Sequence, residues 1–429
     1  MTSSAGAVAG WSPPPREPWV ERLNALGRNL GDEGQSLVPL DEATLLAGAR
    51  AATGLDDFGD DWFRAPLAKL LGSLESEARL TLLGRLFARS EIQRILQNRL
   101  RIEDWIRTHP EVLAERVEAP IFVTGLGRSG TTLLHELLMQ DPSNRVPLLW
   151  ETFFSVPPPE PASWLTDPRA AAAELEITLM DAAVPALTGM HENAGDLPTE
   201  CIFLFAHQFA TDMFTGEFFV PSYTLWLHGQ DPAPLYAYHR RLLQLLQTRH
   251  PGQWVLKAPS HLGQLPALFR EYPDARVVIT HRDPLRVIGS LCNLMAALHW
   301  MRSDHVDYTA IVRAMSFGFP FLCERVMKQR DTGEVPDERV ADLLYRDLVR
   351  DPIGSVRSLY ARWGRTLSAE AERRMRVFLE DRRHARRAAH DYAFETTGLD
   401  REAEREKYAA YLERYGVPAE VEGRELPAG

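Results

Sequence analysis

The stretch IFVTGLGRSGTT, residues 121–132, decides the fold of this chain. Its apolar start predicts a buried strand at 120–124, and the apolar residues of LLHELLMQ, which follow it, have the spacing of a helix. A strand, a glycine-rich loop and a helix in this order direct a helix N-terminus and free backbone N–H groups at a phosphate. The stretch therefore predicts a P-loop-like site for a phosphate or a similar anion.

The loop departs from that of the nucleoside triphosphatases at one position. Gly125 and Gly130 have the spacing of the two P-loop glycines. The next residue is Thr131, whereas the nucleoside triphosphatases have there a lysine that reaches the β- and γ-phosphates. We therefore expect a ligand that has no γ-phosphate. The loop supplies glycines for close approach of an anion, together with a guanidinium and hydroxyl groups, from Gly125, Gly127, Gly130, Arg128, Ser129, Thr131 and Thr132.

A second candidate anion site lies in ARVVITHRDPLRVIGS, residues 275–290. A predicted strand at 275–280 ends there, and Arg282 follows where magnesium-dependent nucleotide enzymes commonly carry a metal-binding acid. Pro284 suits the first turn of a helix, and that helix returns Ser290 toward Arg282. A joint grip of Arg282 and Ser290 on an anion is the functional interpretation. The alternative is a surface pair between Arg282 and Asp283.

Strands and helices alternate through the middle of the chain. Further strands are predicted at 254–257 and 340–345, and helices at 170–181, 233–249, 260–271, 284–298, 306–329 and 352–363. The alternation indicates an α/β, P-loop-like three-layer fold, in which helices flank both faces of a central parallel sheet. Periodicity upstream of the loop predicts an α-helical N-terminal extension, which either covers a face of the main domain or acts as a lid or dimer arm.

These patterns predict four regions. Their expected bounds are a disordered N-terminus at 1–16, the helical extension at 17–118, the main α/β domain at 119–400, and a charged C-terminal helix with a flexible tail at 401–429. The aromatic segment 201–228 is either core, or the wall of an apolar acceptor pocket or a mobile lid.

Composition narrows the partners and the location. The formal net charge of −11 argues against nucleic acid as a general partner, and the three cysteines are too widely spaced for a disulfide framework. The N-terminus lacks the basic and apolar regions of a signal peptide, and no window offers the roughly 18 apolar residues of a transmembrane segment. We therefore expect a cytoplasmic location. A homodimer is left open.

Two anion sites on one sheet, with neither the lysine nor the metal-holding acid, suit a nucleotide with phosphates at both ends of its ribose. In this combination the chain resembles the sulfotransferases that use 3′-phosphoadenosine 5′-phosphosulfate (PAPS), specifically the bacterial group. Four segments between residues 121 and 354 carry the resemblance, in the family's order: FVTGLGRSGTTLLHELL, WVLKAPSHL, RVVITHRDPLRVIGS and LLYRDLVRDP. Residues 1–118 lie outside it.

The resemblance implies roles for particular residues. The 5′-phosphosulfate is expected at Arg128, Ser129, Gly130, Thr131 and Thr132, the 3′-phosphate at Arg282 and Ser290, and the adenine near Tyr345. It also implies the reaction, transfer of a sulfuryl group to a hydroxyl of a small-molecule or lipid-like acceptor, with release of adenosine 3′,5′-bisphosphate and without a metal.

Catalysis needs positive charge at the sulfuryl group and a base for the acceptor proton. Arg128 and Lys257 are expected to supply the charge, and His261, in a Lys-x-Pro-x-His pattern found in bacterial relatives, is the first candidate base. Eukaryotic cytosolic members have lysine at the position of Arg128, and their histidine lies two residues after the strand-end lysine. The segment MHENAGDLPTE offers alternative bases, or helix-capping groups, in His191, Glu192, Asp196 and Glu200.

Three questions stay open at this point. A late basic segment with Arg386, Arg387 and His390 either closes over the 3′-phosphate, as in the family, or forms a solvated helix. The chain could alternatively be a P-loop nucleotide kinase or phosphotransferase. A third alternative is a nucleotide-binding protein without catalytic activity.

Overall fold

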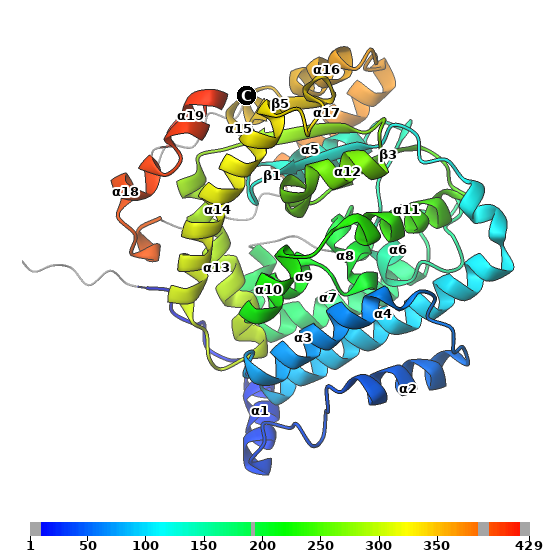
Figure 1. Cartoon of the computed structure of the whole chain (residues 1–429), viewed down its shortest axis with the longest axis vertical. Helices are drawn as coiled ribbons and strands as arrows, with labels where there is room; N and C mark the ends of the chain where they lie inside the picture. The colour runs from blue at the N-terminus through cyan, green and yellow to red at the C-terminus, as the bar shows by residue number, and fades with distance from the viewer. Residues whose placement is uncertain (1–9, 190–193, 385–393, 421–429) are drawn as a thin grey trace, which may run out of the picture.

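A five-stranded parallel sheet, with helices packed on both of its faces, forms the frame of the fold (Figure 1). The computed structural model describes residues 10–189, 194–384 and 394–420. The strand order is β2-β3-β1-β4-β5, with bounds β1 Ile121–Gly125, β2 Asn144–Arg145, β3 Gln253–Lys257, β4 Arg276–His281 and β5 Val340–Leu344. The predicted α/β, P-loop-like fold with helices on both faces of a parallel sheet is confirmed. The edge strand β2 was not predicted, because two residues show no period.

Side chains of β1 alternate between the two faces of the sheet. Ile121 and Val123 pack with α5 Thr131–Met139, α16 Pro352–Arg362 and α17 Ala369–His384. Phe122 faces the other side, where α11 Ala233–Gln247, α12 Leu265–Glu271 and α13 Pro284–Arg302 pack. The parallel register sets Val123 opposite Lys257 and Gly125 opposite Thr280, so the strands end together at one edge of the sheet.

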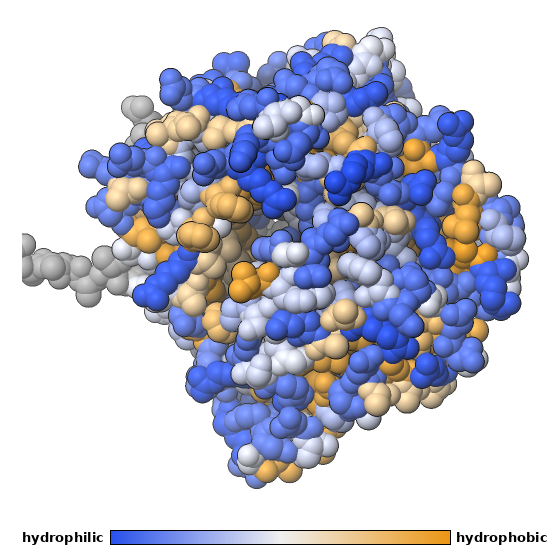
Figure 2. Space-filling model, in the orientation of Figure 1, coloured by the Kyte–Doolittle hydropathy of each residue, from blue (hydrophilic) through white to orange (hydrophobic). Residues whose placement is uncertain are grey.

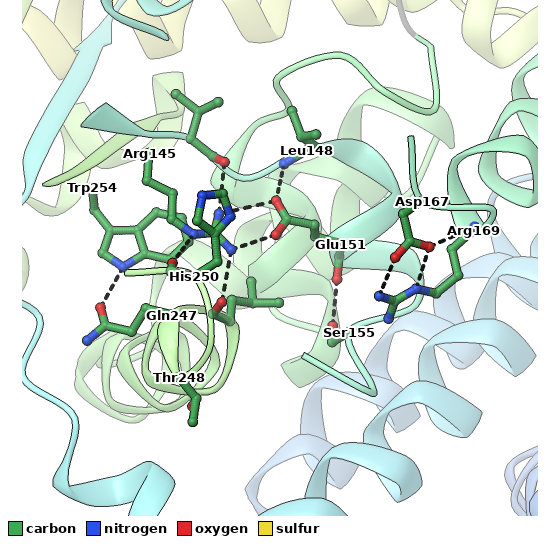
Figure 3. Close-up of polar contacts among 12 residues, drawn as sticks. Arg145, Leu148, Glu151, Ser155, Asp167, Arg169, Gln247, Thr248, His250 and Trp254 are labelled. Carbon is green, nitrogen blue, oxygen red and sulfur yellow. Dashed lines mark hydrogen bonds and ion pairs between the residues drawn. The ribbon is translucent and has the colours of Figure 1, made fainter. Parts of the chain in front are cut away.

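The short strand β2 is held by a buried ion pair (Figure 3). Arg145 Nη2 lies 2.6 Å from Glu151 Oε1, and both side chains are at most 1% exposed. Burial of two charges is tolerated when their remaining hydrogen-bonding groups find partners. Here the guanidinium also donates to the carbonyls of His250 and Leu246, while the Glu151 carboxylate accepts from the Leu148 N–H.

The N-terminal helices are α1 Pro18–Leu30, α2 Glu42–Thr53, α3 Arg64–Ser76 and α4 Leu82–Thr108. Helices α2, α3 and α4 share the core on the Phe122 side of the sheet, whereas α1 packs in a separate small cluster with residues of α4 and α13. The start of α4 approaches the end of α13 so closely that a Cβ at Gly84 would lie 2.0 Å from the Arg302 carbonyl oxygen. The extension therefore covers this side of the molecule, whereas a role as lid or dimer arm stays a prediction.

The remaining helices differ from expectation in places. They are α6 Leu149–Phe153, α7 Arg169–Ala183, α8 Cys201–Phe205, α9 Asp212–Glu217, α10 Pro221–His228, α14 Tyr308–Asp331, α15 Tyr345–Arg350, α18 Arg401–Glu406 and α19 Ala409–Tyr415. The predicted helix 260–271 is a 3-10 turn, Pro259–Gln264, followed by α12. Pro266 explains the break, because a proline inside a helix lacks the N–H and clashes with the preceding turn. Two short helices stand where one C-terminal helix was expected.

Candidate active site

The loop between β1 and α5 depends on two glycines. Gly125 has φ 151°, and a Cβ there would lie 2.5 Å from the Thr280 carbonyl oxygen. Gly130, the N-cap of α5, has φ 92°, and a Cβ there would lie 2.8 Å from Cδ2 of Tyr345. Side chains at these positions would clash with the neighbouring strand and helix, so the close packing of the loop requires glycine.

The predicted loop residues fall into two groups. Arg128, Gly130, Thr131 and Thr132 line a large cavity that opens at this edge of the sheet. Ser129 is fully buried instead, and its hydroxyl contacts the Leu126 carbonyl oxygen at 2.5 Å and the Thr280 hydroxyl at 2.7 Å. The Ser129 side chain therefore holds the loop in shape and does not face the cavity.

The second predicted anion site lies beside the loop. Arg282 Nη1 donates to the Arg128 carbonyl at 2.9 Å, and its guanidinium lies 4.0 Å from the centre of the Tyr345 ring. Arg128 Nε donates to the Ser290 hydroxyl at 3.2 Å. The structure therefore brings together four residues from β1–α5, β4–α13 and β5–α15 that the sequence placed in one nucleotide site.

Arg282 has an acidic partner that was not expected. Its Nε and Nη2 each lie 2.9 Å from an oxygen of Glu420, in a two-pronged ion pair. Asp283 does not take that place, because it caps α13 and accepts from Arg405 at 2.8 Å. The predicted Arg282–Asp283 surface pair is thus replaced by a contact from the C-terminal segment, for which the sequence carries no signal.

Lys257 and Glu200 form the other charged pair of the site. Lys257 Nζ lies 2.6 Å from Glu200 Oε1, and the lysine side chain is only 3% exposed. Glu200 lines the cavity and starts α8 without capping it, so the capping interpretation does not hold for Glu200. Asp196 is exposed and is absent from the cavity wall. His191 and Glu192, like Arg386, Arg387 and His390, lie outside the described residues.

His261 is placed away from the cavity. It is fully buried among Phe122, Phe205 and His239, and its Nδ1 lies 2.7 Å from the Tyr236 hydroxyl. Burial, with a smaller effect of His239, holds the pKa of His261 well below its usual value. The 3-10 turn after Lys257 turns this imidazole into the core, so the structure does not bring it together with the loop.

The cavity has a volume of about 1410 Å³. The segment 201–228 contributes both to its wall and to the core: Phe203, Phe218 and Phe219 line it, whereas Phe205 and Tyr223 are buried outside it. The N-terminal extension adds Trp62, Glu91 and Arg94 to the lining. The mouth of the cavity is apolar, because the strongly exposed Leu225, Phe317 and Phe321 lie on its rim. Figure 2 shows hydrophobic side chains over α10 and α14 beside a hollow.

The described residues lack two further features. Within 10–189, 194–384 and 394–420, helices of the length and apolar character needed to cross a bilayer are absent. The same ranges hold no group of three histidine, cysteine or acidic side chains arranged to hold a metal ion.

Comparison with known proteins identifies the relatives of this chain. The model of a sulfotransferase family matches residues 120–369. The omega-hydroxy-beta-dihydromenaquinone-9 sulfotransferase Stf3 of Mycobacterium bovis is 27% identical over 313 residues, which cover 71% of this chain and 77% of the relative.

Solved structures extend the likeness. The crystal structure of sulfotransferase STF9 from Mycobacterium avium superposes with a TM-score of 0.80 at 32% identity, covering 89% of this chain and 98% of that one. The crystal structure of sulfotransferase STF1 from Mycobacterium tuberculosis superposes with a TM-score of 0.76 at 33% identity, covering 86% of this chain and 98% of that one. Coverage of 89% exceeds what residues 119–429 supply, so the likeness includes part of the N-terminal helices, which the sequence resemblance did not reach.

Proposed function

The chain belongs to the sulfotransferase family, and from this premise we propose that it transfers the sulfuryl group of PAPS to a hydroxyl of a lipid-like acceptor. The products are a sulfate ester and adenosine 3′,5′-bisphosphate. The observation that carries the proposal is the convergence of Arg128, Ser290, Arg282 and Tyr345 at the edge of the sheet. Two guanidinium groups, a glycine loop and an aromatic ring fit a nucleotide with two separate anionic groups.

The donor binds with its phosphosulfate at the loop. The loop N–H groups, Arg128 and the hydroxyls of Thr131 and Thr132 neutralise its charge, since these residues line the cavity together. Arg282 and Ser290 hold the 3′-phosphate, and the Tyr345 ring lies beside the nucleoside. Ser129 keeps the loop in shape from behind.

The reaction requires one proton acceptor. The acceptor oxygen forms a bond to sulfur while the bond from sulfur to the bridging phosphate oxygen breaks, and the hydroxyl proton passes to a base. We assign this role to Glu200, because it is the carboxylate that lines the cavity next to Lys257. Lys257 positions that carboxylate in this state and can turn its positive charge to the sulfuryl group as negative charge develops there.

His261 fits the role of base less well than the sequence pattern indicated. A general base must come within hydrogen-bond reach of the proton it removes, directly or through one water. The imidazole is fully buried on the far side of the turn, and Tyr236 already contacts its Nδ1. We therefore give His261 a structural role in the core.

The size and lining of the cavity support a lipid-like acceptor. The cavity of about 1410 Å³ contains the nucleotide site as well, and it exceeds the roughly 300–1,000 Å³ of ordinary ligand pockets. Away from the loop its lining is rich in phenylalanine, leucine and methionine. One relative is named for a dihydromenaquinone derivative that carries a terminal hydroxyl, which has the same character.

The test is turnover with PAPS and a long-chain primary alcohol, followed by mass spectrometry of both products in the presence of EDTA. Formation of the sulfate ester and of adenosine 3′,5′-bisphosphate in equal amounts supports the proposal. ATP-dependent phosphorylation that EDTA abolishes would instead identify a kinase. Tight binding of adenosine 3′,5′-bisphosphate without ester formation on a broad panel of alcohols would identify a non-catalytic binding protein.

A further inference from the structure

The helix α13 connects the nucleotide site to a second polar region in the same cavity. Ser290, which contacts Arg128, lies near the start of α13, and His299 lies nine residues further along it. A rise of about 1.5 Å per residue places His299 roughly 13 Å from Ser290 along the helix axis. Between them α13 presents an apolar stripe to the cavity, formed by Leu291, Leu294, Met295 and Leu298.

Within the described residues, His299 is a buried polar group whose ring nitrogens make no hydrogen bond of ordinary geometry, although the Thr215 backbone lies nearby. Its side chain lines the cavity, and the residue is 3% exposed. Burial lowers the pKa of His299 to about 4, an effect that the Thr215 backbone offsets only in part. The imidazole is therefore neutral at physiological pH, so one ring nitrogen can donate a hydrogen bond and the other can accept one.

Two carboxyl groups lie in the same region. Glu91 of α4 and Glu217 of α9 both line the cavity, and Arg302 Nη2 lies 3.1 Å from Glu217 Oε2. Burial raises the pKa of Glu91 to about 8, and the neighbouring Glu217 adds to that shift. Glu91 is therefore protonated near neutral pH.

The region then carries no net charge. Arg302 pairs with Glu217, and Arg94 lies 2.9 Å from the Glu176 carboxylate and 3.7 Å from that of Glu91, so these groups balance when Glu91 is protonated. A charged ligand group would be left uncompensated in a largely apolar cavity, which is costly. An uncharged oxygen, by contrast, can bond to the neutral imidazole and to the protonated carboxyl.

We propose that Glu91, Glu217 and His299 form a distal subsite that binds a second, uncharged oxygen function of the acceptor, a hydroxyl or a carbonyl. The apolar stripe of α13 contacts the chain between this oxygen and the hydroxyl that is sulfated. The acceptor class is therefore an apolar molecule with an oxygen function at each end. This inference rests on the proposed function for the reacting end, but binding at the distal end is measurable without turnover.

The experiment compares α,ω-alkanediols with 1-alkanols of the same chain length, over a series of lengths. Dissociation constants are measured on the complex with adenosine 3′,5′-bisphosphate, and kcat/KM is measured with PAPS. One additional hydrogen bond predicts, at one chain length, a preference for the diol of about 3- to 10-fold beyond the two-fold statistical advantage of two equal hydroxyls.

Two variants locate the effect. His299→Phe removes both ring nitrogens, so the ratio of diol to alcohol falls to the statistical value. Met295→Leu changes the same wall without changing its polarity and keeps the ratio. Because the diol and the alcohol are compared on the same variant, a general loss of activity lowers both values and leaves their ratio unchanged.

The outcomes separate this inference from the proposed function. Turnover of diols and alcohols at the statistical ratio at every chain length would overturn the distal subsite and leave the sulfotransferase activity standing. A diol preference in binding, lost in His299→Phe, would support the subsite even if PAPS were not turned over. Equal binding of both series without turnover would overturn both proposals.

Discussion

Glu420 forms an ion pair with Arg282, the residue proposed to bind the 3′-phosphate. The two oxygens of its carboxylate each lie 2.9 Å from a nitrogen of Arg282, and Arg286 Nε lies 3.9 Å from one of them. A phosphate would accept hydrogen bonds from the same N–H groups of Arg282, so the nucleotide has to displace the Glu420 carboxylate. Glu420→Gln should therefore tighten binding of adenosine 3′,5′-bisphosphate.

The magnitude follows from the geometry of the pair. Hydrogen bonds to charged groups contribute about 1.5–3 kcal/mol each, whereas exposed ion pairs contribute about 0–1 kcal/mol. The side chains of Arg282 and Glu420 are 19% and 15% exposed, which places this pair between those limits. Relief of about 1–2 kcal/mol of competition corresponds to roughly 5- to 30-fold tighter binding.

The assay is calorimetric titration of each protein with adenosine 3′,5′-bisphosphate and with adenosine 5′-phosphate, which lacks the 3′-phosphate. Only the bisphosphate should bind the Glu420→Gln variant more tightly. Glu413→Gln is the matched control, because it removes one negative charge from an exposed position of α19. Unchanged affinity for the bisphosphate, or equal tightening for both nucleotides, would refute the reasoning.

The other predictions concern the base, the loop, the 3′-phosphate and the cavity. Glu200→Gln should lower the single-turnover rate by about 10²–10⁴-fold with little change in nucleotide affinity; a His261→Gln variant with a larger loss at unchanged stability would reverse the assignment. Arg282→Ala should weaken binding of adenosine 3′,5′-bisphosphate far more than that of adenosine 5′-phosphosulfate, and equal losses in titrations would argue against the 3′-phosphate assignment. Gly130→Ala should weaken nucleotide binding through its clash with Tyr345, and an unchanged dissociation constant would count against the tight loop. Because the pKa of Glu91 is raised from 4.5 to about 8 on folding, its contribution to stability is greatest at low pH and is lost as pH rises through that window. The free energy of unfolding of the native chain should fall relative to Glu91→Gln by at most ~1.4 kcal/mol per pH unit there, and parallel pH profiles in denaturant titrations would contradict this.

Much of the fold could be predicted from local sequence patterns. Four of the strands and most long helices lie within a few residues of their predicted bounds, because apolar periodicity and glycine or proline boundaries act over short distances. The short elements were missed for the same reason. Strand β2 and the helices α8 to α10 are too brief to show a period, and packing against neighbours sets them instead.

The residues of the candidate site differ in the same way in how well the sequence predicts their positions. Arg128, Arg282 and Tyr345 converge in space because each follows the end of a parallel strand, where the order of the strands brings them together. Ser290 joins them from the second turn of α13, the helix that follows β4. His261 differs, since the direction of its imidazole depends on the turn that Pro266 ends, and on a core that receives the ring. Sequence spacing alone does not determine that direction.

The sequence by itself determined the parallel α/β fold, the glycine-rich loop between β1 and α5 and the membership of this chain in its family, since those depend on contiguous residues. Only the tertiary structure decided which charged groups meet. Lys257 pairs with Glu200 across 57 residues, and Arg282 pairs with Glu420 across 138. Such contacts form because burial makes an unpaired charge costly, and the folded chain determines which partner lies within reach.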